Sequence, residues 1–232
     1  MKISGSTALV TGANRGFGRH LAAELLSRGA TVYAGARNPD SVDLPGVTPV
    51  RLDITDPASI AAAAKLAGDV NLLINNAGID SGTDLLDGDL DLVRLELETH
   101  YLGTLSMARA FAPVIAGNGG GTILNVLSVL SWVNFPKSGA YGAAKSAEWA
   151  MTNALRAQLA DRGVRVAGLH VGYMDTDMAA GVSAAKSDPA LIARIGVDGV
   201  EADAYEIVAD DISRQVQGGL AGGVAALYPQ LP

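Results

Sequence analysis

The chain has 232 residues, and its 24 acidic against 17 basic side chains give a formal net charge of −7. One domain spanning residues 1–232 with one sizeable core is the economical expectation for this length. Hydrophobic residues make up 49% and charged residues 18%, which excludes a disordered chain, and no basic block favours a nucleic-acid partner. Cysteine is absent, which excludes disulfide scaffolds, thiolate catalysis and cysteine-ligated zinc, and three scattered histidines favour no metal site.

The beginning of the chain carries no signal-peptide pattern, because Met1 to Gly5 run straight into a strand-like segment. No apolar run approaches the roughly 18 residues that a membrane span needs. We therefore expect a cytoplasmic protein without a membrane partner.

Short β-branched or aliphatic runs recur along the chain, and most are continuously apolar, which is typical of parallel strands buried on both faces. We predict strands at Thr7–Val10, Thr31–Ala34, Thr48–Leu52, Val70–Asn75, Thr122–Leu127, Val164–His170 and Gly223–Leu227.

Longer Ala- and Leu-rich segments alternate with these runs and indicate crossover helices on both faces of a parallel sheet. We predict helices at Gly18–Arg28, Pro57–Leu66, Leu90–Ala116, Tyr141–Arg162 and Ala202–Gln217. The fold class is therefore α/β with a doubly wound parallel sheet. The segment 175–200 has no clear periodicity and is predicted to be a lid over the substrate.

A glycine-rich turn, Thr11-Gly12-Ala13-Asn14-Arg15-Gly16-Phe17-Gly18, follows the first predicted strand and opens a predicted helix. Glycines allow a tight turn and a close approach to a pyrophosphate, whose charge the helix N-terminus favours. The order of strand, turn and helix strengthens this interpretation over an ordinary loop. The candidate cofactor contacts in the turn are Gly12, Asn14, Arg15, Gly16, Phe17 and Gly18.

The end of the second predicted strand bears on which dinucleotide is bound. An NAD site places an acid about 20 residues after the turn to bind the ribose 2′-hydroxyl. Here Ala36 stands at that position with Arg37 beside it, and Arg15 lies in the turn. A guanidinium group can donate two parallel hydrogen bonds to the oxygens of a phosphate, and the ribose 2′-phosphate distinguishes NADP(H) from NAD(H). The sequence therefore favours NADP(H). The alternative is that both arginines are solvated surface charges.

Two further strand ends carry candidate cofactor contacts. Asp53 and Ile54 follow the third predicted strand, where the carboxylate can accept from an adenine amino group. Asn75-Asn76-Ala77-Gly78 end the fourth, and the small Ala77 and Gly78 leave room for a ribose, with Asn76 a further candidate.

Tyr141 and Lys145 stand four residues apart at the start of a predicted helix, and therefore share one face. The nearby ammonium is expected to lower the tyrosine pKa from about 10, so that Tyr141 can exchange a proton with a substrate oxygen. Ser128 ends the fifth predicted strand and can hydrogen-bond the same oxygen, with Ser131 as a competitor for that role.

These motifs, TGxxxGxG at 11–18, NNAG at 75–78, Ser128 and YxxxK at 141–145, resemble in order and spacing those of the short-chain dehydrogenase/reductase family. The resemblance implies a single Rossmann domain with seven parallel strands, assembled as a homodimer or homotetramer. It also implies reversible hydride transfer between a nicotinamide and a carbonyl or secondary alcohol. Tyr141 would then donate the proton, Ser128 would orient the carbonyl, and Lys145 would hold the nicotinamide ribose and depress the tyrosine pKa.

The chain departs from the family at His100, which stands where the family's NxxG pattern has an asparagine that helps anchor a water for proton relay. An imidazole can carry a proton near neutral pH, so His100 is a candidate catalytic residue in a modified relay. The alternative is a tolerated, damaging or engineered substitution. The change leaves open reduction of C=N or C=C bonds, or a dinucleotide-binding regulatory protein with little turnover.

A second departure is Val171-Gly172, where the family commonly has Pro-Gly. Gly172 keeps the backbone freedom of that position, and Thr176-Asp177-Met178 matches the family's T-D-M stretch, in which the threonine meets the nicotinamide. By resemblance, Gly172, Met174 and Thr176 are expected to contact the cofactor.

Apolar residues surround the expected pocket and favour a small hydrophobic ketone or aldehyde. The candidates are Leu130, Trp132, Phe135, Tyr173 and Met178. Trp132 and Phe135 can equally be core residues, and the two other histidines, His20 and His170, are expected to be structural.

Overall fold

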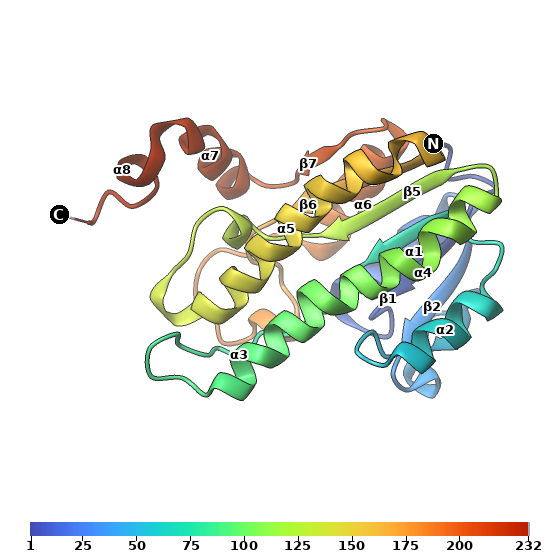
Figure 1. Cartoon of the computed structure of the whole chain (residues 1–232), viewed down its shortest axis with the longest axis horizontal. Coiled ribbons are helices and arrows are strands. Elements are labelled where there is room, and N and C mark those ends of the chain that lie inside the picture. The colour runs from blue at the N-terminus through green and yellow to red at the C-terminus, as the bar shows by residue number, and fades with distance from the viewer. Residues whose placement is uncertain (232) are drawn as a thin grey trace.

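Seven parallel strands form the centre of the computed structural model, which describes residues 1–231 apart from the side chain of Lys137 (Figure 1). Their order across the sheet is β3-β2-β1-β4-β5-β6-β7. The strands are β1 (Thr7–Thr11), β2 (Thr31–Ala36), β3 (Thr48–Arg51), β4 (Leu72–Asn75), β5 (Gly121–Val126), β6 (Val164–His170) and β7 (Glu206–Val208). The direction of winding reverses between β1 and β4, and open α/β sheets bind ligands beyond the carboxyl ends of the strands at such a point.

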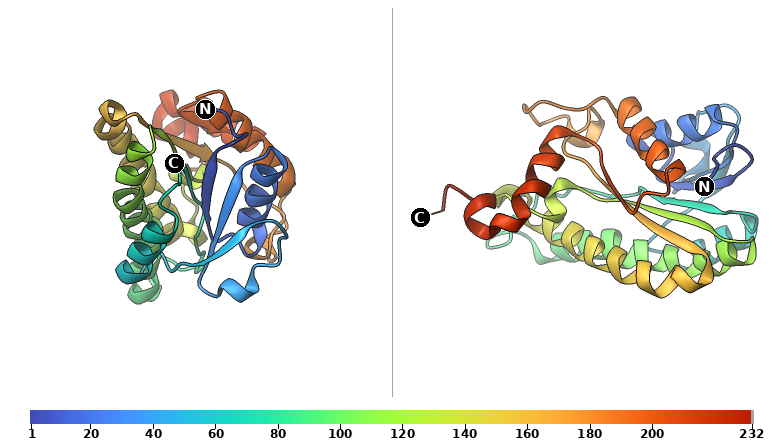
Figure 2. Two further views of the ribbon diagram at one scale, coloured as in Figure 1. Left: turned by 90° about the vertical axis from the view of Figure 1, so that its right-hand side faces the viewer. Right: turned by 90° about the horizontal axis from the view of Figure 1, so that it is seen from above.

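Helices cover both faces of this sheet (Figure 2). α1 (Gly16–Ser27) packs with α6 (Pro189–Glu201) on one face, and α2 (Pro57–Leu66), α4 (Thr104–Gly117) and α5 (Gly139–Leu159) cover the other. The remaining helices are α3 (Leu90–Leu97), α7 (Asp211–Gly219) and α8 (Gly223–Leu227). A π-helical turn, Glu98–Gly103, joins α3 to α4, so the two run on as one long interrupted helix.

The sheet separates two apolar cores. One joins the strands to α1 and α6 through side chains such as Leu21, Leu25 and Ile192. The other joins them to α2, α4 and α5 through side chains such as Phe111 and Leu155. Because each inner strand is covered on both faces, its residues must be apolar throughout, which is the pattern seen in the sequence.

The predicted fold class is confirmed, with helices on both faces of a doubly wound parallel sheet. The first six predicted strands overlap β1 to β6, and α2 occupies the predicted residues 57–66, with Pro57 in its first turn. None of the helices within residues 1–231 is both long and apolar enough to cross a membrane.

The prediction for the C-terminal part is wrong. The seventh strand is Glu206–Val208, inside the predicted helix Ala202–Gln217, and the predicted strand Gly223–Leu227 is helix α8. Ile207 pairs with Leu169 of β6 at the sheet's edge, whereas residues 223–226 are exposed. A strand needs a neighbouring strand for its backbone hydrogen bonds, and β6 offers one to residues 206–208.

The segment 175–200 is also more regular than predicted, because its second part forms most of α6. Asp188 caps this helix by accepting from the Ala190 backbone N–H at 2.9 Å, and Pro189 occupies its first position. Ile192, Ala193, Gly196, Val197 and Val200 are buried at helical spacing. Only residues 175–188 run as loop and short turns, and a lid role for them stays a prediction.

Replacing Ile192 by alanine is expected to lower the free energy of unfolding by about 2–5 kcal/mol, because a buried isoleucine leaves a cavity. Ile192 is 1% exposed, whereas the adjacent Leu191 is 46% exposed. Leu191→Ala is therefore the matched control and is expected to change stability little. Urea denaturation of the three proteins measures both effects, and equal losses for the two variants would contradict the position of α6 in the core.

Candidate active site

The glycine turn adopts a backbone that other residues do not readily allow. Gly12 has φ +65° and Gly16 has φ +53°, both in the left-handed region. A Cβ added at Gly18 would collide with the Gly12 carbonyl oxygen and the Asn76 side-chain amide. The turn thus leads tightly into the N-terminus of α1 with nothing projecting from these three positions, a cradle that fits the pyrophosphate of a dinucleotide.

Hydrogen bonds join this cradle to the end of β4. The Thr11 hydroxyl accepts from the backbone N–H groups of Asn76 and Ala77, each at 2.9 Å. The Asn76 side-chain amide donates to the Thr11 carbonyl oxygen at 2.9 Å. Asn76, a candidate cofactor contact, therefore lies where it holds the glycine turn in place, and Ala77 packs directly against Gly12.

The expected adenosine end of the site lies beside β2 and β3. Arg15 precedes α1 and forms an exposed ion pair with Asp177 at 3.2 Å, and Asn14 donates to the Ser41 hydroxyl at 3.1 Å. Asp53 accepts from the Thr55 backbone N–H and hydroxyl, which hold the pKa of that carboxyl below its ordinary value, and the Arg37 guanidinium adds to this effect.

Two candidates from the same region point into the protein instead. Phe17 is buried in the core between the sheet, α1 and α6. Ile54 is buried in the other core, where it packs against Gly103 of the π-helical turn. If either residue contacts a cofactor, the backbone makes that contact.

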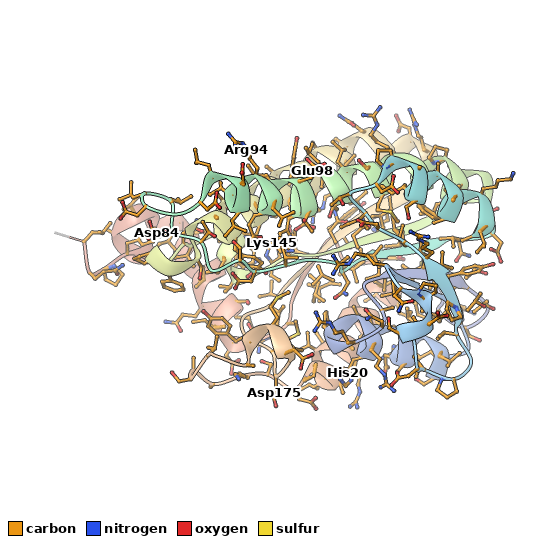
Figure 3. The ribbon with its side chains drawn as sticks, turned by 90° about the horizontal axis from the view of Figure 1, so that it is seen from below. His20, Asp84, Arg94, Glu98, Lys145 and Asp175 are labelled. Carbon is orange, nitrogen blue, oxygen red and sulfur yellow. The ribbon has the colours of Figure 1, made fainter. Side chains whose placement is uncertain are left out.

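The loop after β6 crosses in front of the glycine turn. Thr176 lies within 3.9 Å of the position that a Cβ at Gly16 would occupy. Gly172 donates its backbone N–H to Asp210 at 2.7 Å, and Met174 packs partly buried against the core. Asp175, labelled in Figure 3, lies on this side of the molecule, and Arg94 of α3 lies on the opposite side.

Tyr141, Lys145 and Ser128 come together at the carboxyl end of β5. Lys145, which Figure 3 places in the interior, is 5% exposed, and its Nζ lies 5.8 Å from the centre of the Tyr141 ring. Nζ donates to the Val126 carbonyl oxygen at 2.8 Å. The Ser128 side chain lies close enough to Tyr141 to lower the pKa of its phenol. Ser131, the competitor, lies aside, since its hydroxyl accepts from the Ser128 backbone N–H at 3.3 Å.

His100 lies in the π-helical turn with its ring buried beside Tyr141. The two rings meet edge to face with centroids 5.2 Å apart. Nε2 is 2.8 Å from the Ile79 carbonyl oxygen, 3.3 Å from the Ile79 backbone nitrogen and 3.3 Å from Glu96 Oε2, so the tautomer of the ring decides whether this nitrogen donates or accepts. A Cβ at Gly78 would overlap the imidazole, which explains the glycine at that position.

Two buried carboxylates that the sequence reasoning missed complete the site. Glu96 and Glu148 are 0% and 2% exposed. Glu148 Oε2 lies 2.7 Å from Lys145 Nζ, and Glu96 pairs with His100. Part of the signal was available, because Glu148 lies three residues after Lys145 and so shares the helix face of Tyr141.

The tyrosine pKa is shifted in the direction opposite to the one expected. Burial raises the pKa of Tyr141 above its ordinary value, Lys145 opposes this rise, and Glu148 adds to it. Burial alone would lower the pKa of Lys145, but Glu148 and Tyr141 raise it above its ordinary value. The expectation of a lowered tyrosine pKa is therefore wrong, because burial outweighs the lowering of this pKa by the ammonium and Glu148 adds to the rise.

The candidate substrate residues divide into two groups. Phe135, Tyr173 and Met178 are 49%, 39% and 54% exposed and are accessible to a ligand.

Leu130 is buried in a cluster that also includes Tyr141. Trp132 stacks on His170 with centroids 3.8 Å apart, and His170 in turn pairs with Glu206 at 2.7 Å, so both rings belong to an interior cluster.

Comparison with known proteins identifies the family. Residues 6–187 match the family described as short chain dehydrogenase, so the chain belongs to the short-chain dehydrogenases/reductases and is an oxidoreductase. It is 31% identical over 192 residues to the NADP-dependent 3-hydroxy acid dehydrogenase of Schizosaccharomyces pombe, covering 76% of this chain and 74% of that protein. The chain spans between 59% and 76% of the length of the curated relatives it matches.

Solved structures agree with this assignment. A short chain dehydrogenase from Burkholderia cenocepacia J2315 in complex with NADP has a TM-score of 0.95 and 40% identity, covering 100% of this chain and 99% of that one. A protein of the same family from Burkholderia phymatum in complex with NAD has a TM-score of 0.88 at 24% identity, covering 100% and 99%. The second likeness concerns the fold alone.

Gly18→Ala is expected to weaken dinucleotide binding at least about tenfold, because the added methyl group forces the turn away from Gly12 and Asn76. Gly117→Ala is the control, since a Cβ there meets nothing within 4 Å and lies far along α4. Nucleotide fluorescence titration measures the dissociation constants. An unchanged dissociation constant for the dinucleotide in Gly18→Ala would contradict the assignment of the glycine turn as the pyrophosphate site.

Proposed function

We propose that this protein is an NADPH-dependent oxidoreductase that transfers a hydride reversibly between the nicotinamide and the carbonyl or secondary alcohol of a small hydrophobic molecule. The observation that carries the proposal is the grouping of Ser128, Tyr141 and Lys145 at the carboxyl end of β5. This end lies beside the point where the sheet's winding reverses and next to the glycine cradle.

The three side chains have separate tasks in the reaction. Bound NADPH supplies the hydride to the carbonyl carbon. Ser128 holds the carbonyl oxygen, and the Tyr141 hydroxyl donates its proton to that oxygen as the alcohol forms. Lys145, fixed by the Val126 carbonyl oxygen and Glu148, keeps a third N–H for the nicotinamide ribose. In oxidation the same proton returns to Tyr141.

The preference for NADPH rests on charge at the end of β2. Arg37 follows Ala36, so no acid stands there to bind a ribose 2′-hydroxyl, and Arg15 is near at the start of α1. The similarity to the NADP complex from Burkholderia cenocepacia supports this choice. In the present structure Arg15 pairs with Asp177, and both side chains are mostly exposed, so a 2′-phosphate can compete for this arginine at low cost.

A hydrophobic substrate is supported by the exposed aromatic and sulfur-containing side chains around the site. Phe135 precedes α5, and Tyr173 and Met178 follow β6, so these exposed side chains come from loops that follow the carboxyl ends of β5 and β6. Apolar walls with a few polar groups are characteristic of small-molecule sites.

The purified protein is expected to oxidise NADPH with aryl or aliphatic ketones, and Tyr141→Phe is expected to lose at least about 100-fold in kcat because it cannot donate the proton. Nicotinamide absorbance measures both rates, and nucleotide titration checks that the variant still binds NADPH. Full activity of Tyr141→Phe, or no turnover with any ketone or aldehyde despite tight NADPH binding, would contradict the proposal.

Arg37→Ala is expected to raise the dissociation constant for NADPH at least about tenfold and to leave that for NADH nearly unchanged, because the guanidinium binds only the 2′-phosphate. Arg94→Ala removes an exposed arginine from α3 and serves as the control. Equal effects of Arg37→Ala on the two coenzymes would place the arginine outside the phosphate site.

A further inference from the structure

A buried histidine lies between the catalytic serine and the outermost strand of the sheet. His170 is the last residue of β6 and is 0% exposed. β6 lies between β5, which leads to Ser128, and the edge strand β7 (Figure 1). The proposed reaction gives this ring no task, although it lies at the strand ends where open α/β sheets bind their ligands.

One ring nitrogen of His170 faces the backbone of the serine. Nδ1 lies 3.3 Å from the Ser128 carbonyl oxygen, and that oxygen also accepts from the Ser131 backbone N–H at 2.9 Å. A carbonyl oxygen has no hydrogen to give, so Nδ1 is the donor in this contact. The backbone of Ser128 is thereby held from β6 as well as from its own loop.

The other ring nitrogen faces a carboxylate on the edge strand. Nε2 lies 2.7 Å from Glu206 Oε2. The second oxygen of Glu206 accepts from the Arg156 guanidinium at 2.9 Å and from the Trp149 indole N–H at 3.3 Å, and both donors belong to α5. The carboxylate is thus fixed by a long helix and in turn fixes the outer side of the imidazole.

The flat face of the imidazole supports the chain that follows the serine. Trp132 stacks on His170 with ring centroids 3.8 Å apart and planes 14° apart. Ser128 and Trp132 flank a short helical turn, Val129–Ser131, and we call residues 128–132 the serine turn. One imidazole therefore contacts both ends of the serine turn, the first by Nδ1 and the second by its face.

The serine turn sets the direction of the Ser128 hydroxyl. Ser128 Oγ accepts from the Leu130 backbone N–H at 3.1 Å, so the turn occupies one acceptor position of the hydroxyl and leaves its hydrogen free. In the proposed reaction this hydrogen is directed at the substrate oxygen. A misplacement of about 1 Å in such a group can lower a rate by about 100-fold, because the reacting atoms are no longer aligned.

We propose that His170 is a positioning residue, whose Nδ1–H and stacked ring hold the serine turn while Glu206 holds the ring. The inference rests on the proposed function and adds to it the side chain that places the catalytic serine. His170 contacts neither substrate nor cofactor in this role, so its effect on the reaction passes through Ser128.

Two amide variants separate the contributions of the two ring nitrogens. In His170→Asn the amide stands at the level of Nδ1 and can donate to the Ser128 carbonyl oxygen, whereas in His170→Gln it stands at the level of Nε2, toward Glu206. His170→Phe keeps a flat ring for Trp132 but has no donor. We expect His170→Asn to retain most of the kcat of ketone reduction, and His170→Gln and His170→Phe to lose at least about tenfold in kcat with a smaller change in KM. Equal kcat values for the three variants, measured by nicotinamide absorbance, would overturn the proposal.

A double-mutant cycle decides whether His170 acts through the serine. Ser128→Ala is expected to lower kcat, and adding His170→Phe to it is expected to lower kcat no further, because the group that His170 positions is already absent. Losses that multiply would contradict the proposal. Trp149→Phe is the control, since it disturbs the same cluster on the side of Glu206 and is expected to leave kcat nearly unchanged. Nucleotide titration gives the dissociation constant for NADPH of each protein, so that weaker coenzyme binding is recognised separately.

The parent protein gives a decision that needs neither a variant nor a substrate. Nitrogen-15 NMR of the three histidine rings shows which ring nitrogens carry a hydrogen. His170 is expected to carry one on Nδ1 that is protected from exchange with water. A ring without a hydrogen on Nδ1 would overturn the proposal even where the variants at position 170 do not fold. A missing carbonyl-reductase activity beside a protonated Nδ1 would count against the proposed function and leave the contact between His170 and Ser128 standing.

Discussion

The buried ammonium of Lys145 imposes the strictest constraint on this structure. Such a charge is tolerated in an interior only when acceptors surround it. One acceptor is the carbonyl oxygen of Val126, the last residue of β5, and the other is Glu148, within α5 itself. The lysine therefore joins the helix to the end of the strand. Because Tyr141 precedes Lys145 by one helical turn, the same contacts fix the height and direction of the phenol.

A line of polar side chains continues this arrangement across the interior. The Asn75 amide donates to Asn125 Oδ1 at 2.8 Å between β4 and β5, and the Asn125 amide donates to the Thr152 hydroxyl at 2.8 Å. Thr152 donates in turn to the carbonyl oxygen of Glu148. Each side chain of the line has at least one hydrogen-bond partner inside the protein, whereas Asn75 Oδ1 is buried without one. These hydrogen bonds therefore connect β4, which ends at the NNAG motif, through β5 to the helix α5 that bears the tyrosine.

Local signals in the sequence were enough to predict most of the fold and part of the site. Pro57 marks the start of α2, and the four-residue spacing of Tyr141 and Lys145 places both on one face of α5. The edge strand β7 was missed because three residues carry little pattern, and only the pairing of Ile207 with β6 makes them a strand. Gly223–Leu227 shows the opposite case. Its apolar run predicts a strand, but no strand lies beside it to pair with, and the segment forms a helix instead.

Within the site, the residues that recur as motifs were predictable and their electrostatic surroundings were not. Glu96 and Tyr141 are far apart in the sequence, and a glutamate in a charged segment of a chain gives no sign that it is buried. The raised tyrosine pKa has burial as its largest cause, and the burial of one side chain depends on tertiary packing that has no local signature. The lysine lowers the tyrosine pKa as predicted, but burial and Glu148 together outweigh this effect.

The π-helical turn at Glu98–Gly103 sets the angular relation of two parts of one long helix. A wide turn of this type holds one more residue than the α-helix, and each residue of an α-helix advances the chain by about 100° around the axis. α3 is thereby rotated relative to α4 by the extra residue, without any kink from proline. This rotation bears on which side chains of α3 face inward, where Glu96 is buried while the leucines of the same helix are exposed.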